Sequence, residues 1–217
     1  MSLEKRLKTV QNRINSSDVE LLAVSKKQPV EKIKALYLLG QRKFGESYIQ
    51  EALIKIEKLI DLDIEWHFIG PIQSNKTKYI AKYFDWVQSV DSIKLLTRLN
   101  KQRMSHQKKL NVLLQLKVGG EETKRGLNAH EILTICESSE NFENIKIRGL
   151  MSIPAPTSIY SEQIIQFNEC EGVFKKMQRY IPVDTLSMGM SGDLEAAIES
   201  GSTMVRIGTD IFGKRSV

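Results

Sequence analysis

Short apolar runs alternate with longer amphipathic stretches along almost the whole chain. The short runs are rich in Val, Ile, Leu, Phe and Trp and are bounded by Gly, Pro, Asp or Ser, a pattern typical of buried strands. They predict strands at 21–25, 42–45, 65–69, 85–89, 111–118, 145–151, 184–189 and 204–208. The amphipathic stretches predict helices at 29–40, 47–60, 74–83, 91–104, 128–139, 160–180 and 192–200.

Local signals at the helix ends agree with this pattern. Asn128 and Glu131 have the spacing of a capping box. Pro29 suits the first turn of its helix, and Gly40 suits the left-handed position that follows the last turn. A further amphipathic segment, 3–15, predicts a helix before the first strand.

The regular alternation of strand and helix indicates an α/β fold with a parallel sheet. Eight such repeats in 217 residues fit a closed (β/α)8 TIM barrel with an extra N-terminal helix. An open, doubly wound sheet is the alternative. Because no linker or low-complexity segment divides the chain, we expect residues 1–217 to form a single domain.

Composition excludes several classes of protein. The chain is 41% hydrophobic, which argues against extensive disorder. No apolar run approaches the roughly 18 residues of a membrane span, and the charged N-terminus does not resemble a secretory signal. Cys136 and Cys170 are too few for a disulfide framework. We expect both to be reduced packing residues in a cytoplasmic protein.

The net charge of +6 permits an anionic partner without requiring one. The basic residues form small groups, such as Lys101, Arg103, Lys108 and Lys109, which we expect on solvated faces. A nucleic-acid-binding module is one alternative function. The chain lacks the aromatic-studded basic groove that such binding favours.

The C-terminal ends of the strands carry the functional groups of a TIM barrel. After the seventh strand come Ser191 and Gly192, and after the eighth come Gly208 and Thr209. Small residues at a helix N-terminus let backbone N–H groups approach an anion, and barrels often bind phosphate in these two loops. The alternative is that Ser191 caps its helix and the glycines make turns. Asp193 also counts against an anion site unless its side chain points to solvent.

Lys26 ends the first strand, where its side chain can project into the barrel mouth. Because the first and eighth strands are neighbours in a closed barrel, Lys26 and Arg206 would share that mouth. A partly desolvated lysine can form a Schiff base with an aldehyde, although Lys26 can also be a surface lysine beside Lys27. A lysine, an arginine and a phosphate cradle together are the parts that a pyridoxal phosphate site needs.

Other chemistries find less support. The three histidines, His67, His106 and His130, lack metal-ligand spacing, so we expect no metal. His67 lies between Trp66 and Phe68 in a strand, which predicts a hydrogen-bonded core histidine. The sequence contains neither a phosphate-binding Walker loop nor a dinucleotide fingerprint.

Five sequence blocks closely resemble the pyridoxal phosphate homeostasis proteins, also called proline synthetase co-transcribed homologues. The blocks are AVSKKQP (23–29), FGESYIQE (44–51), EWHFIGPIQSNK (65–76), IRGLMSIPAP (147–156) and LSMGMSGDLEAAIESGSTMVRIGTDIFGKR (186–215). The resemblance runs from about residue 20 to the C-terminus. It implies a barrel like the N-terminal domain of alanine racemase, without that enzyme's second, all-β domain. It also implies a cytoplasmic, monomeric protein that binds pyridoxal 5′-phosphate.

By position, the resemblance makes Lys26 the residue that holds the cofactor as a Schiff base. Arg206 would face the pyridine nitrogen. The residues that would hold the phosphate or lie close to it are Ser191, Gly208, Thr209, Met190 and Gly192. Two positions depart from the family, because Ser47 and Lys117 stand where Asn is usual. If either Asn touches the cofactor, its replacement alters the affinity.

The resemblance implies control of vitamin B6, and indirectly of amino-acid and keto-acid balance, with no settled enzymatic activity. We therefore expect a carrier that buffers pyridoxal phosphate or delivers it to apo forms of pyridoxal phosphate enzymes, without nucleic-acid or membrane partners. The alternative is a pyridoxal phosphate-dependent amino-acid racemase or a related enzyme. Racemisation needs acid–base groups on both faces of the substrate, and Lys26 supplies only one.

Overall fold

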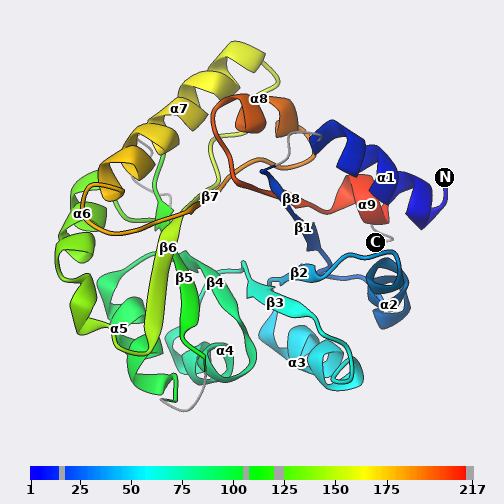
Figure 1. Cartoon of the computed structure of the whole chain (residues 1–217), viewed down its shortest axis with the longest axis horizontal. Coiled ribbons are helices and arrows are strands. Elements are labelled where there is room, and N and C mark those ends of the chain that lie inside the picture. Colours follow the sequence, from blue (N-terminus) through cyan, green and yellow to red (C-terminus); the bar gives the residue numbers. More distant parts are fainter. Residues whose placement is uncertain (15–17, 105–107, 120–124, 214–217) are drawn as a thin grey trace.

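Each predicted strand pairs in parallel with the next, and the last pairs with the first (Figure 1). The computed structural model describes residues 1–14, 18–104, 108–119 and 125–213. In these residues the strands are β1 Glu20–Val24, β2 Lys43–Glu46, β3 Glu65–Phe68, β4 Trp86–Val90, β5 Leu110–Leu116, β6 Ile145–Ser152, β7 Thr185–Ser187 and β8 Met204–Ile207. The closed barrel confirms the predicted fold class and excludes the doubly wound sheet.

Helices surround the barrel (Figure 1). In the described residues they are α1 Leu3–Ile14, α2 Val30–Leu38, α3 Ile49–Lys58, α4 Thr77–Tyr83, α5 Ile93–Gln102, α6 Ala129–Glu137, α7 Tyr160–Met177, α8 Leu194–Glu199 and α9 Thr209–Phe212, with 3-10 turns η1 Ser74–Lys76 and η2 Ser139–Asn141. All but α9 and η2 were predicted or lie within a predicted range, and α9 is too short to show helical periodicity. None of the described helices is long and apolar enough to cross a membrane.

The structure tests the residues that were predicted to begin or end helices. Asn128 and Glu131 form the predicted capping box at the start of α6. Gly40 adopts the predicted left-handed conformation, with φ +97°. Pro29 lies one residue earlier than expected, because it is the N-cap of α2. Residue 15, at the end of the predicted first helix, and the last two residues of the final family block, 214 and 215, lie outside the described residues.

Arg103 corrects the expectation of a solvated basic face. Its side chain is buried, and its guanidinium donates to the carbonyl groups of Ala81, Phe84 and Lys108 at 2.6, 3.0 and 2.8 Å. Carbonyl groups at the end of a helix lack partners within the helix, so the planar donor set of an arginine can bind several at once. Arg103 therefore closes the C-terminal end of α4.

Cys136 and Cys170 are both free and buried, which confirms their prediction as reduced packing residues. They lie on α6 and α7, on the faces that pack toward the barrel. Burial raises the pKa of each thiol to about 11. Both thiols are therefore protonated at neutral pH and unreactive as nucleophiles.

The turn after β7 requires glycine at position 189. Gly189 has φ +96°, and a Cβ at this position would lie 2.5 Å from the Cβ of Ala197 on α8. The carbonyl oxygen of Gly189 also accepts a hydrogen bond from the backbone N–H of Arg206. The absence of a side chain therefore lets α8 pack closely where β7 and β8 end.

We predict that Gly189→Ala destabilises the protein more than Gly40→Ala does. Gly40 has nearly the same φ, +97°, but a Cβ there would meet nothing within 4 Å. Backbone strain alone should cost Gly40→Ala about 1 kcal/mol, and the added clash should bring Gly189→Ala to at least about 2 kcal/mol. Urea unfolding of both variants measures the difference. Equal losses would show that α8 does not pack tightly against this turn.

Candidate functional site

The predicted site residues surround one pocket at the C-terminal mouth of the barrel, with a volume of about 250 Å³. Its lining comprises Lys26, Met190, Ser191, Gly192, Arg206, Gly208 and Thr209, together with Val24, Ile69, Met151 and Ile153. The structure thus brings together every residue that the sequence assigned to the cofactor. Among the described residues, Ser47 and Lys117 do not belong to this lining.

Lys26 lies in a turn whose flanking residues are held by two carboxylates. On one side, the Ser25 hydroxyl donates to Glu46 Oε1 at 2.6 Å. On the other, Lys27 adopts a left-handed φ of 60°, and its backbone N–H donates to Glu51 Oε1 at 2.5 Å. A left-handed conformation is unfavourable for lysine, so these contacts hold the turn in place.

A buried lysine joins the two carboxylates. Lys55 Nζ lies 2.8 Å from Glu46 Oε1 and 2.5 Å from Glu51 Oε1, and it also donates to the carbonyl oxygen of Ser25 at 2.8 Å. Burial raises the pKa of Glu46, and the charge of Lys55 opposes the rise. The sequence analysis missed this cluster. Its only local signal is the four-residue spacing of Glu51 and Lys55 on α3.

Arg206 places a buried guanidinium beside the pocket, with 5% of the residue exposed. Nη1 donates to the Ser187 carbonyl and hydroxyl oxygens at 2.7 and 2.8 Å, and Nη2 donates to the Ser152 carbonyl at 2.8 Å. A guanidinium has five N–H donors, so two remain without an acceptor among the described residues. Burial lowers the pKa of Arg206 to about 10, with Asp193 opposing, so Arg206 stays charged at neutral pH.

A chain of hydrogen bonds leads from Arg206 across the barrel interior. The Ser187 hydroxyl donates to Gln88 Oε1 at 2.8 Å, and Gln88 Nε2 donates to His67 Nδ1 at 2.9 Å. With Nδ1 as an acceptor, the other ring nitrogen, Nε2, donates to Glu65 at 2.9 Å. His67 is fully buried, which confirms its prediction as a hydrogen-bonded core histidine.

The loop after β7 has two backbone N–H groups without an acceptor among the described residues. α8 begins at Leu194 with Asp193 as its N-cap, so the alternative that Ser191 caps this helix is wrong. The Asp193 carboxylate accepts from the Met190 N–H at 2.6 Å and so turns back onto its own loop instead of pointing to solvent. In the described part of the chain, the N–H groups of Ser191 and Gly192 have no acceptor.

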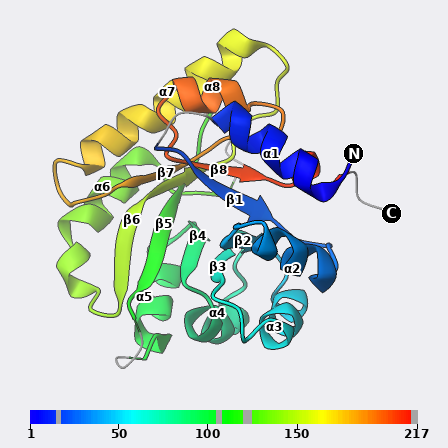
Figure 2. The same ribbon diagram turned by 45° about the vertical axis from the view of Figure 1, so that its right-hand side comes forward.

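α1 ties together the two helices that follow the loops after β7 and β8. Arg13 Nε lies 2.8 Å from Glu195 Oε1 on α8, and Arg13 Nη1 lies 2.7 Å from Asp210 Oδ2 on α9. Figure 2 shows α1 across this side of the barrel. The sequence analysis predicted the helix but not this role. The N-terminal helix therefore supports this side of the pocket from outside.

Within the described ranges, no group of three or more His, Cys, Asp or Glu side chains is placed to hold a metal ion. His67 is engaged by Gln88 and Glu65, and His130 lies exposed on α6. His106 lies outside the described residues.

Comparisons with known proteins agree with this fold. The family model of the alanine racemase N-terminal domain matches residues 1–216, which defines the class of barrel. A protein of Haemophilus influenzae is 44% identical over all of this chain and 97% of its own length. One of Vibrio alginolyticus is 50% identical over 91% of this chain and 87% of its own length. Both are named pyridoxal phosphate homeostasis protein, and the chain belongs to that family.

Solved structures give the same result. PipY of Synechococcus elongatus, solved with pyridoxal phosphate bound, has a TM-score of 0.91 and 32% identity, covering 98% of this chain and 100% of PipY. An alanine racemase of Clostridium difficile has a TM-score of 0.77 at 15% identity, covering 99% of this chain and 57% of the racemase. The latter similarity concerns the fold alone.

The buried His67 predicts a pH dependence of stability. Burial lowers the pKa of His67, and the hydrogen bond to Glu65 only partly opposes this. Below the ordinary histidine pKa of about 6.5, the unfolded chain binds a proton at His67 that the folded chain excludes. The free energy of unfolding should therefore decrease as the pH is lowered below this value, by at most about 1.4 kcal/mol per pH unit for this one proton.

The test compares pH profiles of urea unfolding for the natural protein, His67→Gln and the control His130→Gln. Between about pH 7 and about pH 5, we expect His67→Gln to lose part of the slope and His130→Gln to keep it. If His67→Gln retains the full slope, the histidine accepts a proton within the folded barrel.

Proposed function

We propose that this protein binds pyridoxal 5′-phosphate in the pocket at the barrel mouth and buffers it or delivers it to other proteins. The family name and the cofactor in PipY support the proposal. The observation that carries it is the buried guanidinium of Arg206, which lines the pocket with two N–H donors that have no acceptor among the described residues. Such donors require a ligand acceptor or water in the pocket.

The residues present fit this cofactor. The Lys26 amine would bind the cofactor aldehyde as a Schiff base, with release of water. Arg206 would donate to the pyridine nitrogen, and Ser191, Gly208 and Thr209 would hold the phosphate. Met190 and Gly192 would lie close to it. When bound, pyridoxal phosphate supplies a reactive aldehyde and a ring that can accept electrons.

The pocket favours holding the cofactor over catalysis. Arginine does not give up its proton at neutral pH, so Arg206 can only donate to the ring nitrogen and would keep it unprotonated. An unprotonated ring is a weaker acceptor of electrons. Among the described lining residues, Lys26 and Arg206 are also the only side chains that ionise as acids or bases. A racemase would need a second base on the opposite face.

The proposal also covers the domain organisation, the compartment, the oligomeric state and the recipients of the cofactor. We propose that residues 1–217 act as a single cytoplasmic domain and as a monomer. The recipients would be apo forms of pyridoxal phosphate enzymes, because these need the cofactor and a reversible bond to Lys26 can release it.

We predict that adding pyridoxal phosphate to the protein produces a visible absorption band that depends on Lys26. Borohydride reduction should then fix the cofactor's mass on the peptide that contains Lys26, as mass spectrometry would show. Lys26→Ala should lose the band. Lys27→Arg, which changes the neighbouring amine, should keep it. Finding the reduced adduct on Lys27 or Lys117 would refute the assignment.

We further predict that the loaded protein turns over amino acids negligibly. The assay follows α-proton exchange in deuterated water by mass spectrometry, together with inversion on a chiral column. With one base on one face, exchange without inversion is expected, far below the roughly 1 per second of ordinary enzymes. Inversion at that rate or faster would replace the carrier function with a racemase.

A further inference from the structure

Lys26 is the second residue of a tight turn that runs from Ser25 to Gln28. A hydrogen bond from the Gln28 N–H to the Ser25 carbonyl oxygen, at 3.0 Å, closes the turn. The third residue is Lys27, and among the described residues other than glycine it alone has a positive φ. Glycine and asparagine are usual at such turn positions, so this turn is strained and needs contacts from outside to keep its shape.

Helix α3 brings a charged residue into the protein core at this turn. The helix buries Ile49, Ala52 and Lys55, which are spaced three residues apart on one face. The first two are apolar, whereas Lys55 carries an ammonium group and only 5% of its side chain is exposed. Lys55 Nζ donates to the Ser25 carbonyl oxygen, the same oxygen that closes the turn. Lys55 therefore fixes the peptide group between Ser25 and Lys26.

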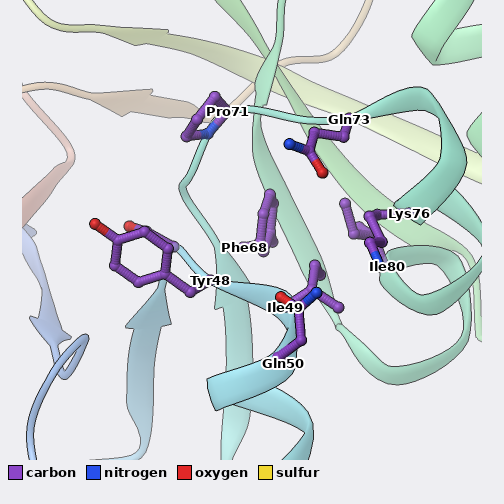
Figure 3. A pocket seen from close by; sticks show the side chains of 9 residues that line it. Tyr48, Ile49, Gln50, Phe68, Pro71, Gln73, Lys76 and Ile80 are labelled. Atoms are coloured by element: carbon purple, nitrogen blue, oxygen red, sulfur yellow. The ribbon is translucent and has the colours of Figure 1, made fainter.

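The connection between β2 and α3 is short, which brings the two carboxylates of the cluster close to the turn. Only residues 47 and 48 separate Glu46, the last residue of β2, from the start of α3. Figure 3 shows the start of this helix at Ile49 and Gln50, beside a pocket of about 190 Å³. Glu46 and Glu51 therefore reach the turn from the strand and from the helix.

Each carboxylate contacts a residue next to Lys26 and also contacts Lys55. Glu51 accepts the hydrogen bond from the Lys27 N–H, and Glu46 accepts the one from the Ser25 hydroxyl. Both lie within ion-pair distance of Lys55 Nζ. The residues before and after Lys26 are thus held by one connected set of charges.

This arrangement is costly for stability. Glu46 is fully buried, and its Oε2 has no hydrogen-bond partner among the described residues. Apolar residues in place of a buried ion pair are often at least as stable, and a left-handed lysine is itself unfavourable. Both costs fall on residues that contact the turn of Lys26. Stability alone does not account for them, whereas the positioning of Lys26 does.

We propose that Glu51 and Lys55 are positioning residues for Lys26. The inference rests on the proposed function, because it concerns the amine that would bind the cofactor aldehyde. In that step Lys26 Nζ bonds to the aldehyde carbon, and the aldehyde oxygen leaves as water with two hydrogens from the amine. Neither Glu51 nor Lys55 belongs to the described lining of the cofactor pocket. Both therefore act through the turn and set how readily this bond forms.

The test compares pyridoxal 5′-phosphate with pyridoxine 5′-phosphate, which has the same phosphate and ring nitrogen but a hydroxymethyl group in place of the aldehyde. Glu51→Ala should weaken the binding of pyridoxal phosphate at least about tenfold, because the turn no longer holds the amine in place. Pyridoxine phosphate should bind this variant as it binds the natural protein, as calorimetry would show. Loss of both ligands in the same proportion would indicate a merely structural role and overturn the proposal.

Matched variants assign the effect to the turn. Glu57→Ala removes the same charge from an exposed position on α3 and should change neither affinity. Glu51→Gln keeps an acceptor for the Lys27 N–H and should recover most of the lost affinity. Lys55→Met combined with Glu46→Gln, which avoids a buried unpaired carboxylate, should again weaken only pyridoxal phosphate.

Two outcomes separate this inference from the function on which it rests. Full affinity of Glu51→Ala for pyridoxal phosphate would overturn the positioning role and leave the proposed function intact. A natural protein that binds neither ligand would overturn the proposed function, and this inference with it.

Discussion

The burial of the positive charge of Arg206 is the constraint on which the barrel mouth depends. Removing a guanidinium from water is unfavourable unless its donors are paired. The carbonyl groups of Ser187 and Ser152 and the Ser187 hydroxyl provide acceptors from two other strands. Gln88 then accepts a hydrogen bond from the Ser187 hydroxyl and donates one to His67, and these two residues lie on two further strands. The polar side chains inside the barrel are thus arranged around the Arg206 guanidinium, which also lines the pocket.

Charged contacts outside the barrel hold the surrounding loops in place. Arg13 joins α8 and α9 after the loops that follow β7 and β8, and Lys55 joins Glu46 and Glu51 beside the Lys26 turn. The pocket therefore lies between two sets of ion pairs, with Lys26 on one side and the loops after β7 and β8 on the other. Such preorganisation lowers the cost of ordering these groups when a ligand binds.

The strands, and the gathering of the proposed site residues at one pocket, were predictable because both leave local signals. Strands of a parallel sheet are buried on both faces and read as apolar runs, and their C-terminal ends meet at one mouth. The contacts of Arg13 were not predictable, because its partners lie 182 and 197 positions away. The hydrogen bond between Ser187 and Gln88 was not predictable either, because no sequence periodicity marks it. The burial of Arg103 depends on backbone carbonyl groups, which every residue carries, so the sequence does not indicate it.

We propose that Arg206 holds the cofactor ring with its nitrogen unprotonated, which suits a carrier. The most direct measurement is nitrogen-15 NMR of the protein loaded with pyridoxal phosphate that is labelled at the ring nitrogen. We predict the chemical shift of an unprotonated pyridine that accepts a hydrogen bond, unchanged across neutral pH. The shift of a protonated pyridinium would contradict it, because Arg206 could not then be the donor to that nitrogen.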